Sequence, residues 1–539
     1  MTSTEPRPGV ITEPAPRPAG HGAAVETVAH HVPGTPEAAW TAAGSRRRTW
    51  VSRAVLIGVL AVQAALSLRQ DNTAFQDEAR YLNSGHVLLA HLLHGTPVPA
   101  DLAGSPLSGA PALSPVLAAL ADTWFGLTGA RLLCLLFMLG ATTLLYALTR
   151  RLFNERAALA AAALFAVTQS TVVLGHVATD DSAAMFLLAL ATWIVVRTAR
   201  ERPALVLLAA PVAALAVGVA YVSVLYLPTL VLLAALVARP HRGGASVVRA
   251  VLLALGVAGP LVAGLCFTDA LDGVRDIFTA RSPGTDGALD LLERSAWWGG
   301  PLFLTACGGA VAYAVRGRMN EAPRTRRLAG PGRARRVLLG LLLCGTALLA
   351  PMFQTHLASS VALHEHLGFG LLFAAPMAGV GLTRLVGAHF RRPQLACALW
   401  VVALCLGISQ SAERFASSPD SNRLNAVLRQ HVTPAMGRYL ASQRDVVAYH
   451  LRDRTDQTRW TSLHGIRYRD PGGTVRRGAD GYRKALADGW FDLVVLDGRT
   501  PMDRVVAGAL RDNAHYRLLG RIPYEGARGA GDYRIWVKR

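Results

Sequence analysis

Long apolar runs alternate with short polar segments along most of this chain. A transmembrane helix needs about 20 mostly apolar residues, and runs that approach this length occur eleven times before residue 412. The predicted spans are residues 50–68, 130–149, 157–175, 182–197, 203–219, 222–238, 247–267, 297–315, 337–353, 366–386 and 394–411. The pattern predicts an α-helical polytopic membrane protein, in which region 203–238 forms either one hairpin or a helix with a re-entrant break.

The pattern changes after residue 411. Strands are predicted in DVVAYHL (445–451), FDLVVLDG (491–498), YRLLGRIPY (516–524) and DYRIWVKR (532–539). Helices are predicted between them in GYRKALADG (481–489) and DRVVAGALRDN (503–513). Residues 412–539 are therefore expected to form a small α/β domain. Residues 1–44 are rich in Pro, Ala, Gly, Thr and Glu without an apolar run, which predicts a disordered tail.

Composition and charge agree with a membrane protein. The 539 residues are 52% hydrophobic, which is too long and too apolar for one soluble core. The net charge of +20 raises the question of nucleic acid, but the arginines stand in short runs between apolar segments, so no nucleic-acid partner is expected. The six cysteines lie in apolar segments without CxxC spacing, which is typical of small core residues rather than redox or metal sites.

The arginine distribution predicts the orientation. If the N-terminus is cytoplasmic, the inner segments hold 24 arginines and the outer loops before the last span hold 5. Positive residues favour the cytoplasmic side. We therefore expect a multi-pass plasma-membrane protein with a cytoplasmic tail (1–44), a transmembrane domain (45–411) whose first outer loop is 69–129, and an extracytoplasmic α/β domain (412–539).

Two adjacent carboxylates follow the first span in AFQDEARYLNSGH (74–86). Residues 75–94 have helical spacing but no run long enough to span, which predicts an amphipathic helix along the outer membrane surface. Asp77 and Tyr81 share one face, while Glu78 points elsewhere because adjacent helical residues lie about 100° apart. One carboxylate can accept a proton while the other orients or neutralises an arginine; the alternative is an ordinary solvated helix start.

Three further polar groups are expected at the same surface. Asp180 and Asp181 lie at the turn between the third and fourth spans, where one of them is expected to cap the next helix. The segment LHEH brings His364, Glu365 and His366 to the outer side, where a divalent metal is one possible ligand and hydrogen-bonding histidines are the alternative. Arginines in outer loop 268–296 stand against the inside bias and are candidates for phosphate binding: Arg275, Arg281 and Arg294.

Taken together, these segments resemble a known family. AFQDEARYLNSGH, ATDDSAAMFLLALATW, ALHEHLGFGLLFAAPMAG, FDLVVLDG and GDYRIWVKR are similar to the actinobacterial branch of the GT-C glycosyltransferases, family 39 type. That type includes protein O-mannosyltransferases and aminoarabinose transferases, which use polyprenyl-phosphate sugars. The resemblance covers about residues 45–539 and implies Asp77 as catalytic base, with Glu78 beside it and Asp181 at the second acidic position. The proposed substrate-binding residues are Asp180, Arg80, Tyr81, Arg275, Arg281, Tyr221, His364, Glu365 and His366.

The chain departs from the family at two positions. Similar sequences often carry a lysine at the turn between the fifth and sixth spans and another in the LHxH motif, where this chain has Ala220 and Glu365. Those lysines are thought to help hold the lipid phosphate. Arg275, Arg281, His364 and His366 are candidates to compensate for them.

The expected function is cell-envelope glycosyl transfer. The enzyme would move a hexose or pentose from a polyprenyl phosphate to a hydroxyl of a protein, glycan or lipid outside the cytoplasm, with inversion and with Asp77 as general base. No cofactor is required by this reading, although a divalent metal remains possible. One alternative is a GT-C protein that binds a lipid-linked sugar or a partner without turnover. A transporter or flippase fits less well, because the predicted spans are nearly free of charge at their centres.

Overall fold

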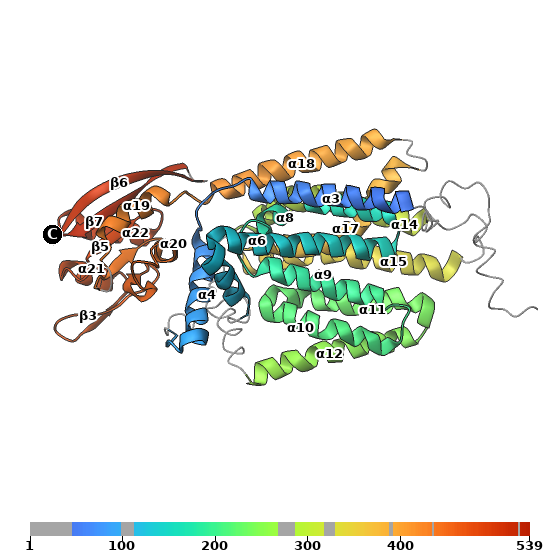
Figure 1. Ribbon diagram of the computed structural model, residues 1–539, viewed down its shortest axis with the longest axis horizontal. Coiled ribbons are helices and arrows are strands. Elements are labelled where there is room, and N and C mark those ends of the chain that lie inside the picture. Colours follow the sequence, from blue (N-terminus) through green and yellow to red (C-terminus); the bar gives the residue numbers. More distant parts are fainter. Residues whose placement is uncertain are drawn as a thin grey trace, which may run out of the picture.

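The computed structural model describes residues 46–98, 113–267, 286–316, 329–387, 392–433, 436–526 and 529–539. The predicted tail 1–44 and the candidate residues Arg275 and Arg281 lie outside these ranges. Figure 1 shows a bundle of roughly parallel helices with an α/β domain at one end. This arrangement agrees with the predicted fold class.

All eleven predicted spans coincide with helices. Within the described ranges, eight helices or joined helices are long and apolar enough to cross a membrane. They are α3 (Arg46–Leu68), α6 (Leu113–Leu152), η2 (Tyr221–Tyr226) with α11 (Leu227–Arg242), α12 (Ala245–Phe267), α14 (Ala288–Arg316), α15 (Ala329–Thr346) with α16 (Leu349–Leu357), α17 (Leu363–Val386) and α18 (Pro393–Ala416).

The other three predicted spans correspond to shorter helical segments. They are α7 (Glu155–Ala166) with α8 (Gln169–Leu174), α9 (Asp181–Arg197), and η1 (Pro203–Ala209) with α10 (Ala210–Val219). Region 203–238 is therefore two successive helical segments, which meet at Ala220 in an extended conformation. The described helices confirm a multi-pass architecture.

Helix α17 is the central helix of the bundle, since 83% of its apolar window is buried. Small residues allow its neighbours to approach closely. A Cβ added to Gly309 of α14 would lie 1.9 Å from the carbonyl oxygen of Met377, and one added to Gly379 would lie 2.1 Å from that of Ala157 in α7. Backbone packing at these glycines fixes α17 between α7 and α14.

Helix α4 (Gln76–His94) lies across the end of the bundle, nearly perpendicular to the long helices (Figure 1). This orientation is the one expected for an amphipathic helix in the membrane surface. The first part of α6 packs beside α4, and a non-helical backbone at Gly126 (φ 66°, ψ −168°) separates it from the part that runs along the bundle. Ala79 and Leu82 of α4 share a buried cluster with Ala118 and Ala130 of α6.

The C-terminal domain contains a five-stranded sheet in the order β2-β1-β5-β7-β6. Strands β2, β1 and β5 are parallel, whereas β7 is antiparallel to both β5 and β6. The strands are β1 (Tyr439–Ala441), β2 (Trp460–Thr461), β5 (Leu493–Leu496), β6 (Tyr516–Gly526) and β7 (Gly529–Lys538), with a separate hairpin of β3 (Arg467–Arg469) and β4 (Val475–Arg477).

Helices cover both faces of this sheet. The helices are α19 (Asn422–His431), α20 (Arg444–His450), α21 (Gly478–Ala487) and α22 (Pro501–Arg511). Alternate residues of β5 enter opposite cores: Leu493 and Val495 pack with α19 and α20, and Val494 and Leu496 pack with α21 and α22. Three predicted strands (β5, β6 and β7) and both predicted helices are confirmed.

The predicted strand DVVAYHL is wrong, because residues 444–450 form helix α20. Its four central residues, 446–449, are all buried. The sequence of the helix therefore shows no alternation of apolar and polar residues with a helical period. The cause is packing on two sides: Val447 and Ala448 enter the core of the sheet, while Val446 and Tyr449 enter the cluster formed by α4 and α6. Helix α20 thus joins the α/β domain to the end of the bundle where α4 lies.

Candidate active site at the end of the bundle where α4 lies

Asp77 and Glu78 occupy the first turn of α4 in contrasting environments. Asp77 is exposed, whereas Glu78 is 3% exposed. Both oxygens of Glu78 accept hydrogen bonds from Arg131, from Nε at 2.9 Å and from Nη2 at 2.8 Å. Arg131 also donates to the carbonyl oxygen of Asn72 at 2.8 Å. This bidentate pair fixes the start of α4 against α6 and leaves the carboxylate of Asp77 directed elsewhere.

Glu78 also holds the turn that precedes α9. The amide of Ala178 donates to its Oε1 at 2.9 Å. This turn carries Asp180 and Asp181, which are 7% and 6% exposed. Asp180 stands at the N-cap position of α9, but its side chain makes no capping hydrogen bond, so a cap does not explain it.

The start of α17 contributes a third polar segment. The side chain of His364 accepts a hydrogen bond from Nε of Arg414 in α18 at 3.1 Å, and Oε1 of Glu365 lies 3.5 Å from Nε2 of His364. His366 faces a different neighbour, Gln354, whose Nε2 lies 2.8 Å from its Nδ1. The two histidines of the HxH motif therefore have separate partners.

The three segments converge at one site. Asp77, Asp180 and Glu365 are close enough to Asp181 to interact with it electrostatically, and Asp77 and Arg414 interact in the same way with Glu365. Four carboxylates, from α4, the start of α9 and the start of α17, thus lie close to one another, and Arg414 lies close to Glu365. Grouped acids of this kind keep part of their number protonated, or require a cation beside them.

Arg80 and Tyr81 extend the site along α4. Arg80 is half-buried and interacts electrostatically with Asp445 of α20. Burial raises the pKa of Asp445, while Arg444 and Arg80 lower it. Tyr81 is buried beside Asp180, and burial together with this carboxylate raises the pKa of its hydroxyl.

Tyr221 lies half-buried at the start of η2. Its neighbour in η2, Tyr226, reaches α17, where its hydroxyl donates to the carbonyl oxygen of His366 at 3.0 Å.

The described residues include no group of three or more His, Cys, Asp or Glu side chains placed to hold a metal ion.

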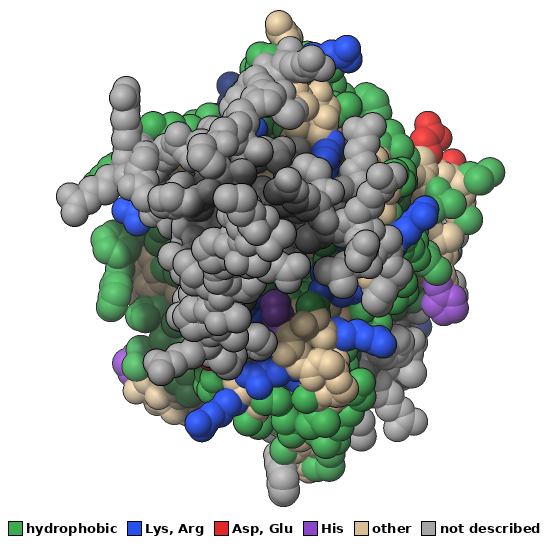
Figure 2. All heavy atoms as spheres, turned by 90° about the vertical axis from the view of Figure 1, so that its right-hand side faces the viewer, with side chains coloured by type: hydrophobic (Ala, Val, Ile, Leu, Met, Phe, Trp, Pro, Cys, Tyr) green, Lys and Arg blue, Asp and Glu red, His purple; other side chains and the backbone are tan. Residues whose placement is uncertain are grey.

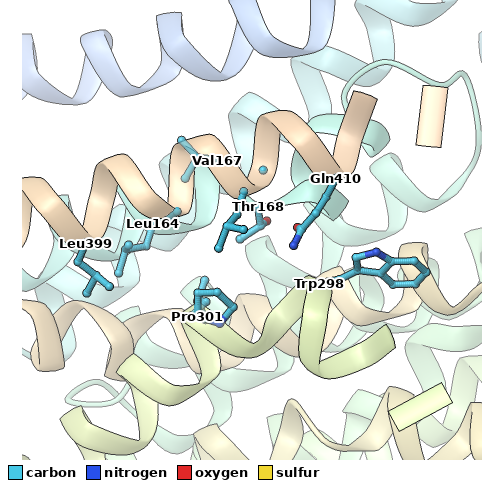
Figure 3. Close-up of a pocket in the computed structure, with 11 residues that line it drawn as sticks. Leu164, Val167, Thr168, Trp298, Pro301, Leu399 and Gln410 are labelled. Atoms are coloured by element: carbon cyan, nitrogen blue, oxygen red, sulfur yellow. The ribbon is translucent and has the colours of Figure 1, made fainter. Parts of the chain in front are cut away.

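An apolar cavity lies next to this site, between α14 and α18 (Figure 3). It is a small, partly open cavity lined mainly by leucine, alanine, valine and proline side chains. At its polar end, Nε2 of Gln410 donates to the carbonyl oxygen of Trp297 at 2.7 Å. The ring of Trp298 also lines the cavity and packs edge-on against His364. Because His364 contacts Arg414, the cavity ends beside the charged site.

Known proteins share this architecture. Residues 111–263 match the profile of the dolichyl-phosphate-mannose-protein mannosyltransferase family. ArnT from Cupriavidus metallidurans in the apo state has a TM-score of 0.56 at 16% identity, covering 91% of this chain and 98% of that chain. ArnT bound to undecaprenyl phosphate gives 0.55 at 15% identity, with the same coverage of 91% and 98%. The chain has the GT-C glycosyltransferase fold.

A second GT-C structure extends the comparison. The archaeal oligosaccharyltransferase AglB from Archaeoglobus fulgidus, in complex with an inhibitory peptide and a dolichol-phosphate, gives a TM-score of 0.52 at 12% identity. The match covers 90% of this chain and 74% of that chain. Among curated proteins, no sequence matches.

Sequence reasoning missed Arg414 in this GT-C site. Arg414 lies in the last turn of α18, at the end of the final span that the arginine counts predict to be outside. The same signal selected Arg275 and Arg281, but it was applied only to loops before the last span. Arg131 was missed because its partner, Glu78, lies 53 residues away in the sequence.

Proposed function

We propose that this protein transfers a sugar from a polyprenyl-phosphate donor to a hydroxyl group outside the cytoplasm. The observation that carries the proposal is the exposed carboxylate of Asp77 close to Asp181 and Glu365, in a site whose His364 packs against Trp298 of the apolar cavity. Undecaprenyl phosphate in the ArnT structure and dolichol-phosphate in the AglB structure support a lipid-linked donor.

The orientation is part of the proposal. We place the N-terminus of α3 and the arginine-rich loops in the cytoplasm, and the α/β domain outside. Figure 2 views the bundle from the end opposite the α/β domain, where several separate groups of arginine side chains are visible among apolar ones. Nucleotide sugars do not cross a bilayer, so an outward site needs a sugar carried by a lipid.

Donor binding is assigned to Arg414 and the cavity. The guanidinium of Arg414 would pair with the phosphate, and its position at the outer membrane boundary matches that of a lipid headgroup. The first prenyl units would lie in the cavity between α14 and α18, against Leu164, Pro301 and Leu399. This assignment supplies the cation that Ala220 and Glu365 do not provide.

The reaction is one displacement. The acceptor oxygen attacks the anomeric carbon of the sugar, the bond from that carbon to the phosphate oxygen breaks, and polyprenyl phosphate leaves. Asp77 accepts the proton of the acceptor hydroxyl. A single displacement inverts the anomeric configuration. The transferred sugar can be a hexose or a pentose, since nothing in the proposed chemistry distinguishes them.

The neighbouring acids have different proposed roles. Glu78 is a positioning residue, because both its oxygens are held by Arg131 and Ala178. Asp181, buried next to Asp180, would orient the sugar or acceptor hydroxyls, because a carboxyl group can do so in either protonation state. We keep residues 45–411 and 412–539 as the two proposed domains, with 1–44 as a cytoplasmic tail.

The test compares the wild type with Asp77→Asn, using purified full-length protein and a panel of polyprenyl-phosphate-linked hexoses and pentoses. A well-placed general base contributes roughly 10²–10⁴-fold to the rate, so sugar release from the cognate donor should fall by about this factor. Donor KM should change much less. Equal rates for the two proteins would remove Asp77 from the role of base, and an inactive wild type would favour a binding protein without turnover.

A further inference from the structure

The contact between the α/β domain and α4 has no role in the reaction as described so far. Helix α20 follows β1 directly and packs on α4, so the carboxyl ends of β1 and β5 point toward the first turn of α4 (Figure 1). In open α/β sheets, ligands bind beyond the carboxyl ends of the parallel strands. This end of the sheet therefore lies beside Asp77.

A row of polar side chains crosses the junction. Nε2 of Gln443, just after β1, donates to Oδ2 of Asp497, just after β5, at 2.7 Å. Oε1 of the same Gln443 faces Nε2 of Gln76 at 3.5 Å, the outer limit of a hydrogen bond. Gln76 directly precedes Asp77. The Gln76 amide nitrogen is a donor and Oε1 of Gln443 is an acceptor, so the pair offers one group of each kind to a hydroxyl placed beside it.

Asp445 continues the row beside Gln443. Its main-chain oxygen accepts a hydrogen bond from Asn83 of α4 at 3.0 Å, which fixes α20 against α4. Its carboxylate interacts electrostatically with Arg80 and with Asp77 itself. Donors and acceptors from both domains thus alternate within reach of the proposed base.

We infer that the acceptor is a carbohydrate, held through its hydroxyl groups at the junction of α4 and α20, with Gln443 and Asp445 as acceptor-binding residues. The inference rests on the proposed function and specifies its acceptor. Amide and carboxylate side chains bind vicinal hydroxyls because they offer paired donors and acceptors. A peptide is commonly bound by pairing with an exposed strand edge, whereas strands β1 and β5 present their ends to this site and have neighbours on both sides.

The test measures acceptor use by the full-length enzyme with its cognate polyprenyl-phosphate donor. The acceptor probes are methyl glycosides of common hexoses and pentoses, and a peptide rich in Ser and Thr. The wild type should transfer sugar to at least one methyl glycoside in preference to the peptide. Gln443→Ala and Asp445→Asn should each raise the KM for that glycoside at least tenfold and lower the ratio of transfer to donor hydrolysis.

Two further variants protect the test against trivial failure. Gln76→Ala changes the same row from the α4 side without altering the α/β domain, and should also raise the glycoside KM. Asp480→Asn changes a side chain of α21 that is 75% exposed, and should leave the glycoside KM unchanged. An active enzyme whose glycoside KM is the same in all variants, or which uses only the peptide, would overturn this inference alone. A wild type without transfer or hydrolysis would overturn the proposed function as well.

Discussion

The two ends of the helix bundle use charged side chains in different ways. At the end opposite the α/β domain, which we propose to be cytoplasmic and call the inner end, Arg151 donates to the main-chain carbonyl of Arg197 at 3.0 Å, and Arg242 to that of Arg200 at 2.8 Å. At the outer end, charged side chains pair with each other across distant segments, as in Glu78 with Arg131 and Asp122 with Arg452.

The two kinds of contact differ in how specific they are. A carbonyl near the C-terminal end of a helix accepts a donor from any nearby cation, so Arg151 and Arg242 satisfy backbone groups without specifying a partner. A bidentate pair between an arginine and a carboxylate works only for those two groups in one relative orientation. The outer end is therefore built to hold particular atoms in place, as a catalytic site requires.

The largest effect is expected at the buried pair. Glu78→Gln leaves the guanidinium of Arg131 buried without its charge partner, and breaking a buried pair in this way costs about 3–5 kcal/mol. The side chains of Arg131 and Glu78 are only 9% and 4% exposed, so water does not relieve the loss. We expect a large drop in thermal stability in detergent and near-complete loss of sugar release.

A matched control is the exposed pair of Arg150 and Glu155 at the inner end, whose side chains are 57% and 23% exposed. Arg150→Gln should change stability by about 1 kcal/mol or less. If Glu78→Gln is as mild as this control, then the outer pair has no special role in holding α4.

Arg414 is expected to have the next largest effect, through donor affinity. Arg414→Met removes the cation proposed for the lipid phosphate and should raise the donor KM about 10–100-fold, because charge-assisted hydrogen bonds are worth roughly 1.5–3 kcal/mol. Arg414→Lys should restore part of the affinity but not all, since lysine lacks the planar fork. The measurement is initial rate against donor concentration.

Arg69 provides the control for this prediction. It also lies at the outer end, but it donates to the carbonyl of Ile408 at 2.8 Å and to the hydroxyl of Ser411 at 3.2 Å, both in α18. Arg69→Met should lower stability without changing the donor KM. Similar KM values for the Arg69 and Arg414 variants would mean that α18 is simply sensitive to the loss of an arginine.

The sequence predicted the helices of the bundle better than the residues of its outer end. Apolar runs located all eleven helical segments, because burial in lipid acts on each segment by itself. The short strands β1 and β2, of three and two residues, carry too little pattern to detect. Helix α20 was read as a strand because two different domains bury its opposite sides, which erased the period of an amphipathic helix.

The candidate site residues came from local patterns. Asp77 and Asp181 each stand in a pair of adjacent acids next to an apolar segment, and Glu365 stands in the LHEH segment. Their neighbours Arg131 and Arg414 come from other helices, and no local pattern links them to these acids. Asp77 is exposed and Glu78 is held by Arg131. This difference could be seen only in the three-dimensional structure.

An intermediate effect is expected at Asp122, which docks the α/β domain. Its buried carboxylate contacts Nε2 of His86 at 2.5 Å, Nη2 of Arg452 at 2.8 Å and the hydroxyl of Tyr449 at 2.7 Å. Asp122→Asn keeps the shape but loses the charge and one acceptor, at a cost of about 1–3 kcal/mol. Hydrogen exchange should rise in α20 while the centre of α17 stays protected.

Asp453 supplies the control for the docking prediction, one residue beyond Arg452. It forms an exposed ion pair with Arg429, at side-chain exposures of 51% and 44%. Asp453→Asn should leave hydrogen exchange in α20 unchanged, because exposed pairs contribute little. Equal exchange in the Asp122 and Asp453 variants would show that apolar packing alone, through Val446 and Tyr449, docks the domain.

The smallest effect is expected at the inner end, where Arg151→Ala removes one exposed hydrogen bond to a main-chain carbonyl. Such surface substitutions usually change the free energy of unfolding by no more than about 0.5 kcal/mol. Arg151→Lys and Arg151→Ala should therefore have the same stability and the same rate of sugar release. The membrane orientation of the variant should also stay the same, because the predicted inner segments hold 24 arginines against 5 in the outer loops and lose only one of them. Loss of activity in Arg151→Ala with a normally folded and oriented protein would place chemistry at the inner end. The inner end would then do more than set the membrane orientation, and the contrast with the proposed catalytic end would fail.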